Sequence, residues 1–341
     1  MKAPTFWLRS PPTLKARALA PIGAVYSAVG WWRHKITQPW TAEIPVICVG
    51  NLVAGGAGKT PVAMALAELL LGRNETGQTP VHFITRGYGG RLKGPTQVDP
   101  DQHSAVDVGD EALLLAERAP TWVAHRRQDG AKAAECAGAK LIILDDGFQN
   151  PGLAKTASLI VADGGTGFGN GCVIPSGPLR EPITRGLKRA DAVIVVGEDR
   201  AGVVKTVAGR LPIFKARIAP EPALKERLEG ERVLAFAGIG HPEKFFATCA
   251  ATGARLIDCV SFPDHYPYLP EEIVTLANRA RQAGAILVTT AKDAVRIRPD
   301  LRPMVLTLSV RLLWTAGALQ GLLSLMEDKG CLSALSHNSN T

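Results

Sequence analysis

Short runs of apolar residues recur along the chain, and segments with a helical spacing of apolar positions separate them. Buried strands are predicted over residues 46–49, 81–85, 141–144, 159–162, 192–196, 233–237 and 285–289. Helices are predicted over 61–71, 107–118, 125–134, 242–252 and 271–283. Because strands and helices alternate, the sequence predicts an α/β protein with a largely parallel sheet that carries helices on both faces.

The regular pattern weakens around residues 211–229, where prolines and charges replace any clear period. We therefore predict a larger domain over 41–212 and a second, smaller α/β domain over 213–329. Two domains suit a chain of 341 residues, of which 46% are apolar. Residues 330–341 form a polar tail that we expect to be flexible.

Residues 1–40 differ from the rest of the chain in charge. All charged side chains before Glu43 are basic, and an uncharged run, 18–32, lies between Arg17 and Arg33. As a helix this run would rise about 22 Å, too little to cross a hydrocarbon core of about 30 Å. The segment is therefore typical of a helix that lies in a membrane interface. The alternative is a helix packed on the protein's own core.

A glycine-rich turn connects the first predicted strand to the first predicted helix. Glycines let the backbone approach a polyphosphate, and the N–H groups at a helix start point toward an anion. Val53 stands where the usual pattern has its first glycine, and Gly-Lys-Thr follows at the expected place. We predict an ATP-binding P-loop, with a ligand-free turn as the alternative. The predicted nucleotide-binding residues are Gly55, Gly56, Ala57, Gly58, Lys59 and Thr60.

Two aspartates follow directly after the predicted strand 141–144. A hydrophobic strand that ends in Asp145 and Asp146, well downstream of the loop, is typical of the Walker B element that orders Mg²⁺. We predict that these two carboxylates and the hydroxyl of Thr60 form a magnesium site. The alternative is an ordinary acidic turn.

Two loops, and the segment 125–127 after a short predicted strand near Trp122, carry residue types suited to contacts with a substrate or a phosphate. A loop with two arginines and a tyrosine among glycines follows the strand 81–85, at the strand end where open α/β sheets place ligands. A long loop over 164–189 is rich in glycine and proline, and long loops in compact domains are often functional. The predicted contacts are Arg86, Tyr88, Arg127, Arg180 and Glu181.

The motifs, taken in order, resemble those of the tetraacyldisaccharide 4′-kinase family of the lipid A pathway in Gram-negative bacteria. Any one motif is weak, but the ordered set extends from residue 49 to 295 and is highly specific. The matching stretches are Val49–Pro61, Thr85–Gly90, Val108–Glu111, Asp145–Gln149, Pro175–Glu181, Ala237–Pro242, Phe262–His265 and Thr290–Val295.

The resemblance implies a P-loop NTPase-like kinase with its active site between two domains. The enzyme would transfer the γ-phosphoryl group of ATP, with Mg²⁺, to the 4′-hydroxyl of a tetraacylated glucosamine disaccharide 1-phosphate. Asp110 and His265 would form the catalytic pair, with Lys59 serving the phosphates. From the residues alone, Asp110 has the alternative role of an acid that stabilises a helix N-terminus. The family also implies a peripheral position on the cytoplasmic face of the bacterial inner membrane, held by the N-terminal segment.

The net charge of +8 favours an anionic partner, which here would be the acylated lipid substrate and the anionic membrane surface. One competing function is a membrane-associated regulatory P-loop ATPase, which would have little use for His265 in a second domain. Another is a nucleic-acid-binding ATPase, but the strong basic cluster is N-terminal and interleaved with apolar residues. We expect no nucleic-acid partner and no obligate protein partner.

Overall fold

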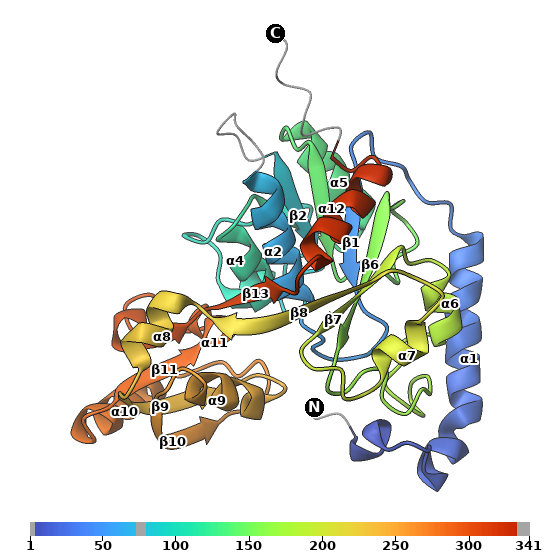
Figure 1. The fold of residues 1–341 in the computed structure, drawn as a ribbon. Coiled ribbons are helices and arrows are strands. Elements are labelled where there is room, and N and C mark those ends of the chain that lie inside the picture. Colours follow the sequence, from blue (N-terminus) through green and yellow to red (C-terminus); the bar gives the residue numbers. More distant parts are fainter. Residues whose placement is uncertain (1–3, 73–79, 333–341) are drawn as a thin grey trace.

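The computed structural model describes residues 4–72 and 80–332 (Figure 1). The described residues form one nine-stranded sheet and one four-stranded sheet, each covered by helices on both faces. The prediction of an α/β fold with a largely parallel sheet and a second, smaller α/β unit is confirmed. We call the two sheets with their helices the large domain and the small domain.

Nine strands build the sheet of the large domain. They are β1 (Val46–Gly50), β2 (Val81–Thr85), β3 (Thr96–Gln97), β4 (Thr121–Val123), β5 (Leu141–Asp145), β6 (Ala157–Asp163), β7 (Ala192–Val196), β8 (Ile213–Pro220) and β13 (Val310–Trp314). Their order among the described residues is β13-β8-β7-β6-β1-β5-β2-β4-β3. All pairs are parallel except β13 with β8 and β3 with β4. The predicted P-loop strand, β1, and the predicted Walker B strand, β5, are therefore direct neighbours.

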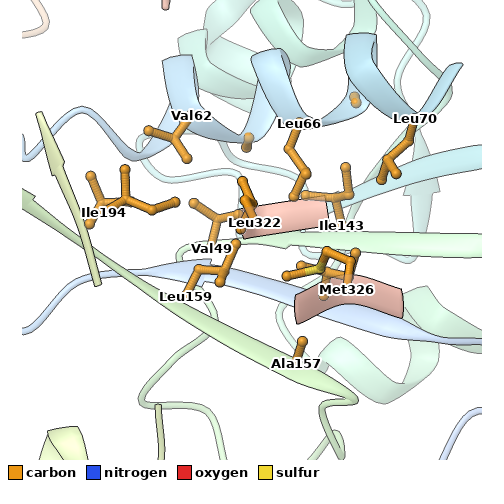
Figure 2. Packing of buried hydrophobic residues seen from close by; sticks show 14 of the residues in the cluster. Val49, Val62, Leu66, Leu70, Ile143, Ala157, Leu159, Ile194, Leu322 and Met326 are labelled. Carbon is orange, nitrogen blue, oxygen red and sulfur yellow. The ribbon is translucent and has the colours of Figure 1, made fainter. Parts of the chain in front are cut away.

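Helices bury both faces of this sheet. On one face, α2 (Lys59–Leu71) and α12 (Ala318–Asp328) pack side chains such as Leu66 and Met326 over β1, β5, β6 and β7 (Figure 2). On the other face lie α5 (Arg127–Cys136), α6 (Ile183–Leu187) and α7 (Val203–Val207). Because both faces are covered, every residue of β1, β2, β5 and β7 is buried, as is usual for parallel sheets.

The small domain has an all-parallel sheet between helices. Its strands are β9 (Arg232–Ala237), β10 (Arg255–Ser261), β11 (Ile286–Thr290) and β12 (Leu306–Leu308), in the order β10-β9-β11-β12. One face packs against α10 (Pro270–Gln282), and the other against α8 (Pro222–Leu228) and α9 (Pro242–Ala250). The short α11 (Ala291–Ala294) follows β11, and a 3₁₀ turn, η2 (Arg302–Met304), precedes β12.

The two sheets do not divide the chain where the sequence placed the boundary. Ile213, at the start of β8, pairs with Val193 of β7 in the large sheet. The antiparallel pair of β8 and β13 leads the chain from the large domain to the small one and back (Figure 1). The predicted second domain, 213–329, is therefore corrected at both ends: β8, β13 and α12 belong to the large domain. Cys331 and Leu332 join its core too, while the rest of the predicted tail, 333–341, lies outside the described residues.

The N-terminal segment contains a 3₁₀ turn, η1 (Thr5–Leu8), and a long helix, α1 (Leu14–Ile36), that runs along the large domain beside α6 (Figure 1). The helix packs closely through Gly23, where an added Cβ would lie 2.9 Å from the carbonyl oxygen of Val173. Its other face is apolar and open to the outside. No helix within the described ranges is long and apolar enough to cross a membrane. The exposed large apolar residues of α1 are Leu14, Ile22, Val25, Tyr26, Val29, Trp31, Trp32 and Ile36.

Candidate active site

The loop between β1 and α2 has the backbone shape that a phosphate-binding loop needs. Gly58, directly before the first residue of α2, has a φ of 83°, and Gly55 has a φ of 122°. Both values favour glycine, so the residue types are explained by the turn itself. The free N–H groups of the first turn of α2 then provide an anion-binding helix end. Gly56, Ala57 and Lys59 complete the predicted loop.

Thr60 and Asp145 form the core of the predicted magnesium site. The Thr60 hydroxyl donates a hydrogen bond of 3.1 Å to Asp145 Oδ2. The other oxygen, Oδ1, is buried and has no hydrogen-bond partner among the described residues. Burial, with a further contribution from Glu111, raises the pKa of Asp145 to about 7. A buried carboxylate oxygen without a donor, beside a hydroxyl, fits a hard divalent cation such as Mg²⁺.

Asp146 lies between two cations. Its Oδ2 is 3.8 Å from Lys59 Nζ, and Arg180 forms two hydrogen bonds with its carboxylate, of 2.9 and 3.2 Å. Burial raises the pKa of Asp146, but Lys59 and Arg180 outweigh burial, so the net pKa is lowered and the carboxylate is ionised at neutral pH. The residue has a φ of 52°. Asp146 therefore positions the loop lysine and Arg180 beside one another.

Glu181 is bound to other residues of the protein. Arg189 Nη2 donates to both of its carboxylate oxygens at 2.5 Å, and Gln149 Nε2 donates to Oε1 at 3.2 Å. The same amide group of Gln149 donates to the Asn51 carbonyl at 2.9 Å. Glu181 thus supports the start of the P-loop through Gln149. Both of its carboxylate oxygens already accept hydrogen bonds from other residues of the protein.

Asp110 and His265 meet between the two domains. His265 Nδ1 lies 3.1 Å from Asp110 Oδ2. Asp110 begins α4 (Asp110–Ala116), directly after Gly109, whose φ of 85° separates α4 from α3 (Ala105–Val108). The predicted continuous helix over 107–118 is therefore wrong. A side chain at Gly109 would lie 2.4 Å from the Tyr88 carbonyl oxygen, so the break depends on glycine.

The electrostatics of this pair favour the charged forms of both partners. Burial raises the pKa of Asp110, but the hydrogen bond from His265 and the charges of Lys292 and Arg296 outweigh burial and lower it. The hydrogen bond with Asp110 raises the pKa of His265, against the opposing effect of its partial burial. The pair therefore combines an ionised carboxylate with a readily protonated imidazole.

Two residues near the pair were assigned no role from the sequence. Lys292 Nζ forms an ion pair of 2.8 Å with Glu111, which follows Asp110. Arg296 Nε lies 3.7 Å from Asp110 Oδ2. Both belong to the segment that begins with α11, and Lys292 lies in the stretch Thr290–Val295 that resembled a family motif. A cationic motif at the carboxyl end of β11 was the signal that could have singled them out.

The remaining predicted contacts lie at the ends of neighbouring strands. Parallel pairing of Thr85 with Val123 puts Arg86, after β2, beside the segment that leads from β4 to Arg127. Burial lowers the pKa of Arg127 to about 10, and its Nε is buried without a hydrogen-bond partner in the described structure. The exposed Tyr88 ring lies with its centroid 5.6 Å from that of His265. The predicted residues thus gather at one edge of the large sheet and at the small domain facing it.

The chain matches known proteins over most of its length. A family model described as tetraacyldisaccharide-1-P 4′-kinase matches residues 15–327. The tetraacyldisaccharide 4′-kinase of Rhodospirillum centenum is 52% identical over 317 residues, covering 92% of this chain and 93% of the relative. That of Rhodospirillum rubrum is 50% identical over 320 residues, covering 92% and 94%.

A solved structure shares the fold over nearly the whole length. The crystal structure of LpxK from Aquifex aeolicus in complex with ATP matches with a TM-score of 0.73 at 26% sequence identity, covering 92% of this chain and 99% of that one. Sequence relatives, family match and fold all agree over both domains. The chain therefore belongs to the tetraacyldisaccharide-1-phosphate 4′-kinase family.

Proposed function

We propose that this protein transfers the γ-phosphoryl group of ATP to the 4′-hydroxyl of a tetraacylated glucosamine disaccharide 1-phosphate, in the lipid A pathway. The observation that carries the proposal is the Asp110–His265 contact, which puts a base at the boundary between the P-loop domain and the small domain. Family membership supports the same reaction, because the family description names this acceptor.

Phosphoryl transfer needs mainly positioning and charge stabilisation from the protein. The loop from Gly55 to Thr60 holds the ATP phosphates, and Lys59 neutralises charge on the transferred group. Thr60, Asp145 and Asp146 are the residues that would hold Mg²⁺, and the bound ion would supply charge stabilisation to the ATP phosphates. The orphaned oxygen of Asp145 supports this assignment.

The acceptor hydroxyl must lose a proton as the new P–O bond forms. Asp110 accepts this proton, and His265 orients the carboxylate through its Nδ1. Because His265 comes from the small domain, the pair is complete only when the two domains face each other as they do here. Such an arrangement limits the access of water to the transferred group and so limits wasteful ATP hydrolysis.

Three of the five predicted contacts are proposed to touch the acceptor or the phosphates directly. Tyr88 is placed for this role by its exposed ring beside His265. Arg127 has a buried Nε with no hydrogen-bond partner among the residues that the structure describes, and Arg86 follows the neighbouring strand. Arg180 and Glu181 lie nearby, but act through Asp146, Arg189 and Gln149 in this structure.

We propose in addition that α1 lies in the cytoplasmic face of the bacterial inner membrane. Its outward face carries valine, isoleucine and tryptophan side chains, and basic residues stand near both ends, as in helices that bind an anionic interface. The other face packs on the protein: Arg185 Nη1 donates to the Ser27 carbonyl at 3.0 Å. In this proposal the two alternatives from the sequence are compatible, because one face of α1 packs on the protein and the other lies in the membrane interface.

The direct test is an assay with γ-labelled ATP and purified disaccharide 1-phosphate, with the label read in the lipid fraction. We expect labelled lipid and little free phosphate. A regulatory P-loop ATPase, the alternative function, would release phosphate at the same rate with or without the lipid acceptor. No observation in the structure favours that alternative, because it gives Asp110 and His265 no task.

A further inference from the structure

Arg296 is almost fully buried and uses its guanidinium group on the backbone around His265. Its Nη1 donates to the Tyr266 carbonyl at 3.1 Å, and its Nη2 donates to the Gly238 carbonyl at 2.9 Å. Its Nε donates to the Lys292 carbonyl at 3.1 Å. A guanidinium carries its donors in a rigid planar fork, so bonds to three carbonyls fix these segments relative to one another.

Two of these carbonyls lie next to His265, one in the following residue and one bonded to its backbone N–H. The N–H of His265 itself donates to the Gly238 carbonyl at 3.0 Å, the same oxygen that Arg296 holds. Tyr266 is the next residue along the chain. His265 has a φ of 57°. A residue other than glycine keeps such a positive φ only where the surrounding structure restrains its backbone. Arg296 provides such a restraint on both sides of the residue.

A buried carboxylate in turn holds Arg296. Asp293 Oδ1 accepts hydrogen bonds from Arg296 Nη2 at 2.7 Å, from the Tyr268 hydroxyl at 2.7 Å and from the Gly238 N–H at 2.9 Å. Asp293 is fully buried, so this network is shielded from water. A Cβ at Gly238 would lie 2.8 Å from the Tyr268 hydroxyl oxygen, which leaves no room for another residue there.

The same guanidinium also faces the other domain, because its Nε lies 3.7 Å from Asp110 Oδ2. We infer that Arg296 is a positioning residue, which sets the His265 imidazole in hydrogen-bond reach of Asp110 and anchors the pair across the domain boundary. The inference rests on the proposed roles of Asp110 and His265 in catalysis. It adds the residue on which their geometry depends.

The test is Arg296→Lys in the full-length enzyme. Lysine keeps the positive charge, but its single ammonium group cannot reach the carbonyls of Gly238 and Tyr266 in the geometry of a fork. We expect kcat to fall by about 10-fold or more, because small displacements of catalytic groups cost large factors in rate. The KM for ATP should stay within about 2-fold of the wild-type value, because Arg296 lies outside the P-loop. A change in this KM would mean that the substitution had altered the binding of ATP itself.

Arg302→Lys is the matched control. Arg302 also donates to backbone carbonyls of the small domain, those of Ile297 at 3.0 Å and Val295 at 3.2 Å, but has no contact with His265 or Asp110 in the described structure. Arg302 is exposed whereas the Arg296 side chain is buried, so the melting temperature of each variant is measured beside its kcat to separate lost stability from lost positioning. We expect kcat to fall in Arg296→Lys and to stay near the wild-type value in Arg302→Lys. Equal losses would overturn the inference.

The decisive measurement repeats Arg296→Lys in a His265→Ala background. If Arg296 acts through His265, the second change should cost less than about 2-fold in kcat, because residues that act as a unit are not additive. A multiplicative loss would overturn the inference. A His265→Ala enzyme with full activity would instead overturn the proposed role of His265 itself, so the two failures are distinguishable.

Tyr268→Phe is the milder second variant, for use if thermal melting shows that Arg296→Lys does not fold. It removes one donor from Asp293 and keeps the packing of the ring. We expect kcat to fall by about 2- to 5-fold, and that loss should also disappear in the His265→Ala background. An undiminished kcat in Tyr268→Phe, together with an unfolded Arg296→Lys, would assign Arg296 to stability alone.

Discussion

Asp110 and His265 lie 155 residues apart in the sequence, yet Nδ1 of the histidine is 3.1 Å from Oδ2 of the aspartate. The two residues come from different domains, so their contact depends on how the two sheets face each other. A helix N-terminal acid contributes about 0.3–1 kcal/mol to stability. A catalytic base contributes about 10²- to 10⁴-fold in rate, or about 2.7–5.4 kcal/mol at the barrier. These magnitudes separate the two roles of Asp110 by experiment.

Asp110→Asn should lower kcat by about 10²-fold or more while the melting temperature moves by only a few degrees. Asparagine keeps the shape of the side chain but cannot accept the proton of the acceptor hydroxyl. Steady-state kinetics and thermal melting measure both quantities. Asp107→Asn is the matched control, because Asp107 accepts from the Ser104 N–H at 2.8 Å as part of the N-terminal capping box of α3. That variant should lose stability and keep its rate. An Asp110→Asn enzyme that also loses stability and keeps its rate would leave Asp110 with the structural role alone.

Lys59→Ala should leave the protein folded and remove most of the phosphoryl transfer. Without Lys59, Asp146 still has its two hydrogen bonds with Arg180, so its buried charge stays compensated. The transferred group, by contrast, would lose the cation that the loop provides. Circular dichroism checks the fold and the labelled-lipid assay checks the activity, with the exposed Lys205→Ala as a control. A folded Lys59→Ala enzyme with near-full activity would show that the nucleotide binds elsewhere.

Asp145→Asn should uncouple stability from ligand binding. Because burial raises the pKa of this carboxyl to about 7, keeping it ionised in the folded protein at pH 8 costs free energy, and a neutral amide removes that cost. The melting temperature of the free variant should therefore equal or exceed that of the wild type. The increase in melting temperature on adding Mg²⁺ and ATP should largely disappear, because a ligand stabilises only in proportion to its affinity. A full increase in the variant would exclude Asp145 as a magnesium ligand.

Local patterns predicted the parts of the fold that depend on neighbouring residues. The strands at Val46–Gly50, Leu141–Asp145 and Ala192–Val196 are continuous apolar runs because both faces of the sheet are covered, and the sequence places each within a residue or two. The excursion through β8 and β13 was missed. In β8, buried and exposed residues are mixed, so its burial gives no strong signal, and its partner β13 enters about ninety residues later. Pairing over such a distance is set by tertiary contacts.

The site shows the same division. Residue types at strand ends identified the P-loop and the aspartates Asp145 and Asp146, because phosphate and metal chemistry requires those types locally. The partners of these residues were not visible in the sequence. Nothing near Glu181 indicates that Arg189 occupies its oxygens, and nothing near His265 indicates that Arg296 holds the backbone on both sides of it. Such roles follow from the folded path of the chain, since eight positions separate Glu181 from Arg189 and thirty separate Tyr266 from Arg296.

His265→Asn should destabilise the protein more at pH 5.5 than at pH 8.5. The folded pKa of His265 is raised above its ordinary value of about 6.5, so the stability from protonated His265 is present below that pH and fades as pH rises through the raised pKa. The folded pKa of Asp110 is lowered, so its contribution is lost only in acid, as pH falls below about 3.9. Thermal melting of both proteins at the two pH values gives the comparison. If the difference in melting temperature between the two proteins does not change with pH, Asp110 does not favour the protonated form of His265.

The last prediction concerns the outward face of α1. Val25 and Val29 are 65% and 59% exposed, one helical turn apart, so substitution of both by aspartate removes apolar surface and adds negative charge without opening the packed face. We expect the double variant to keep its melting temperature and to lose most of its binding to vesicles that contain anionic lipid, in a sedimentation assay. Ile257→Asp is the control, because Ile257 is exposed on β10 of the small domain, away from α1. High salt should weaken wild-type binding only in part, since it screens the basic residues of α1 but leaves the apolar contact. Unchanged vesicle binding of the double variant would place the membrane contact on another surface of the protein.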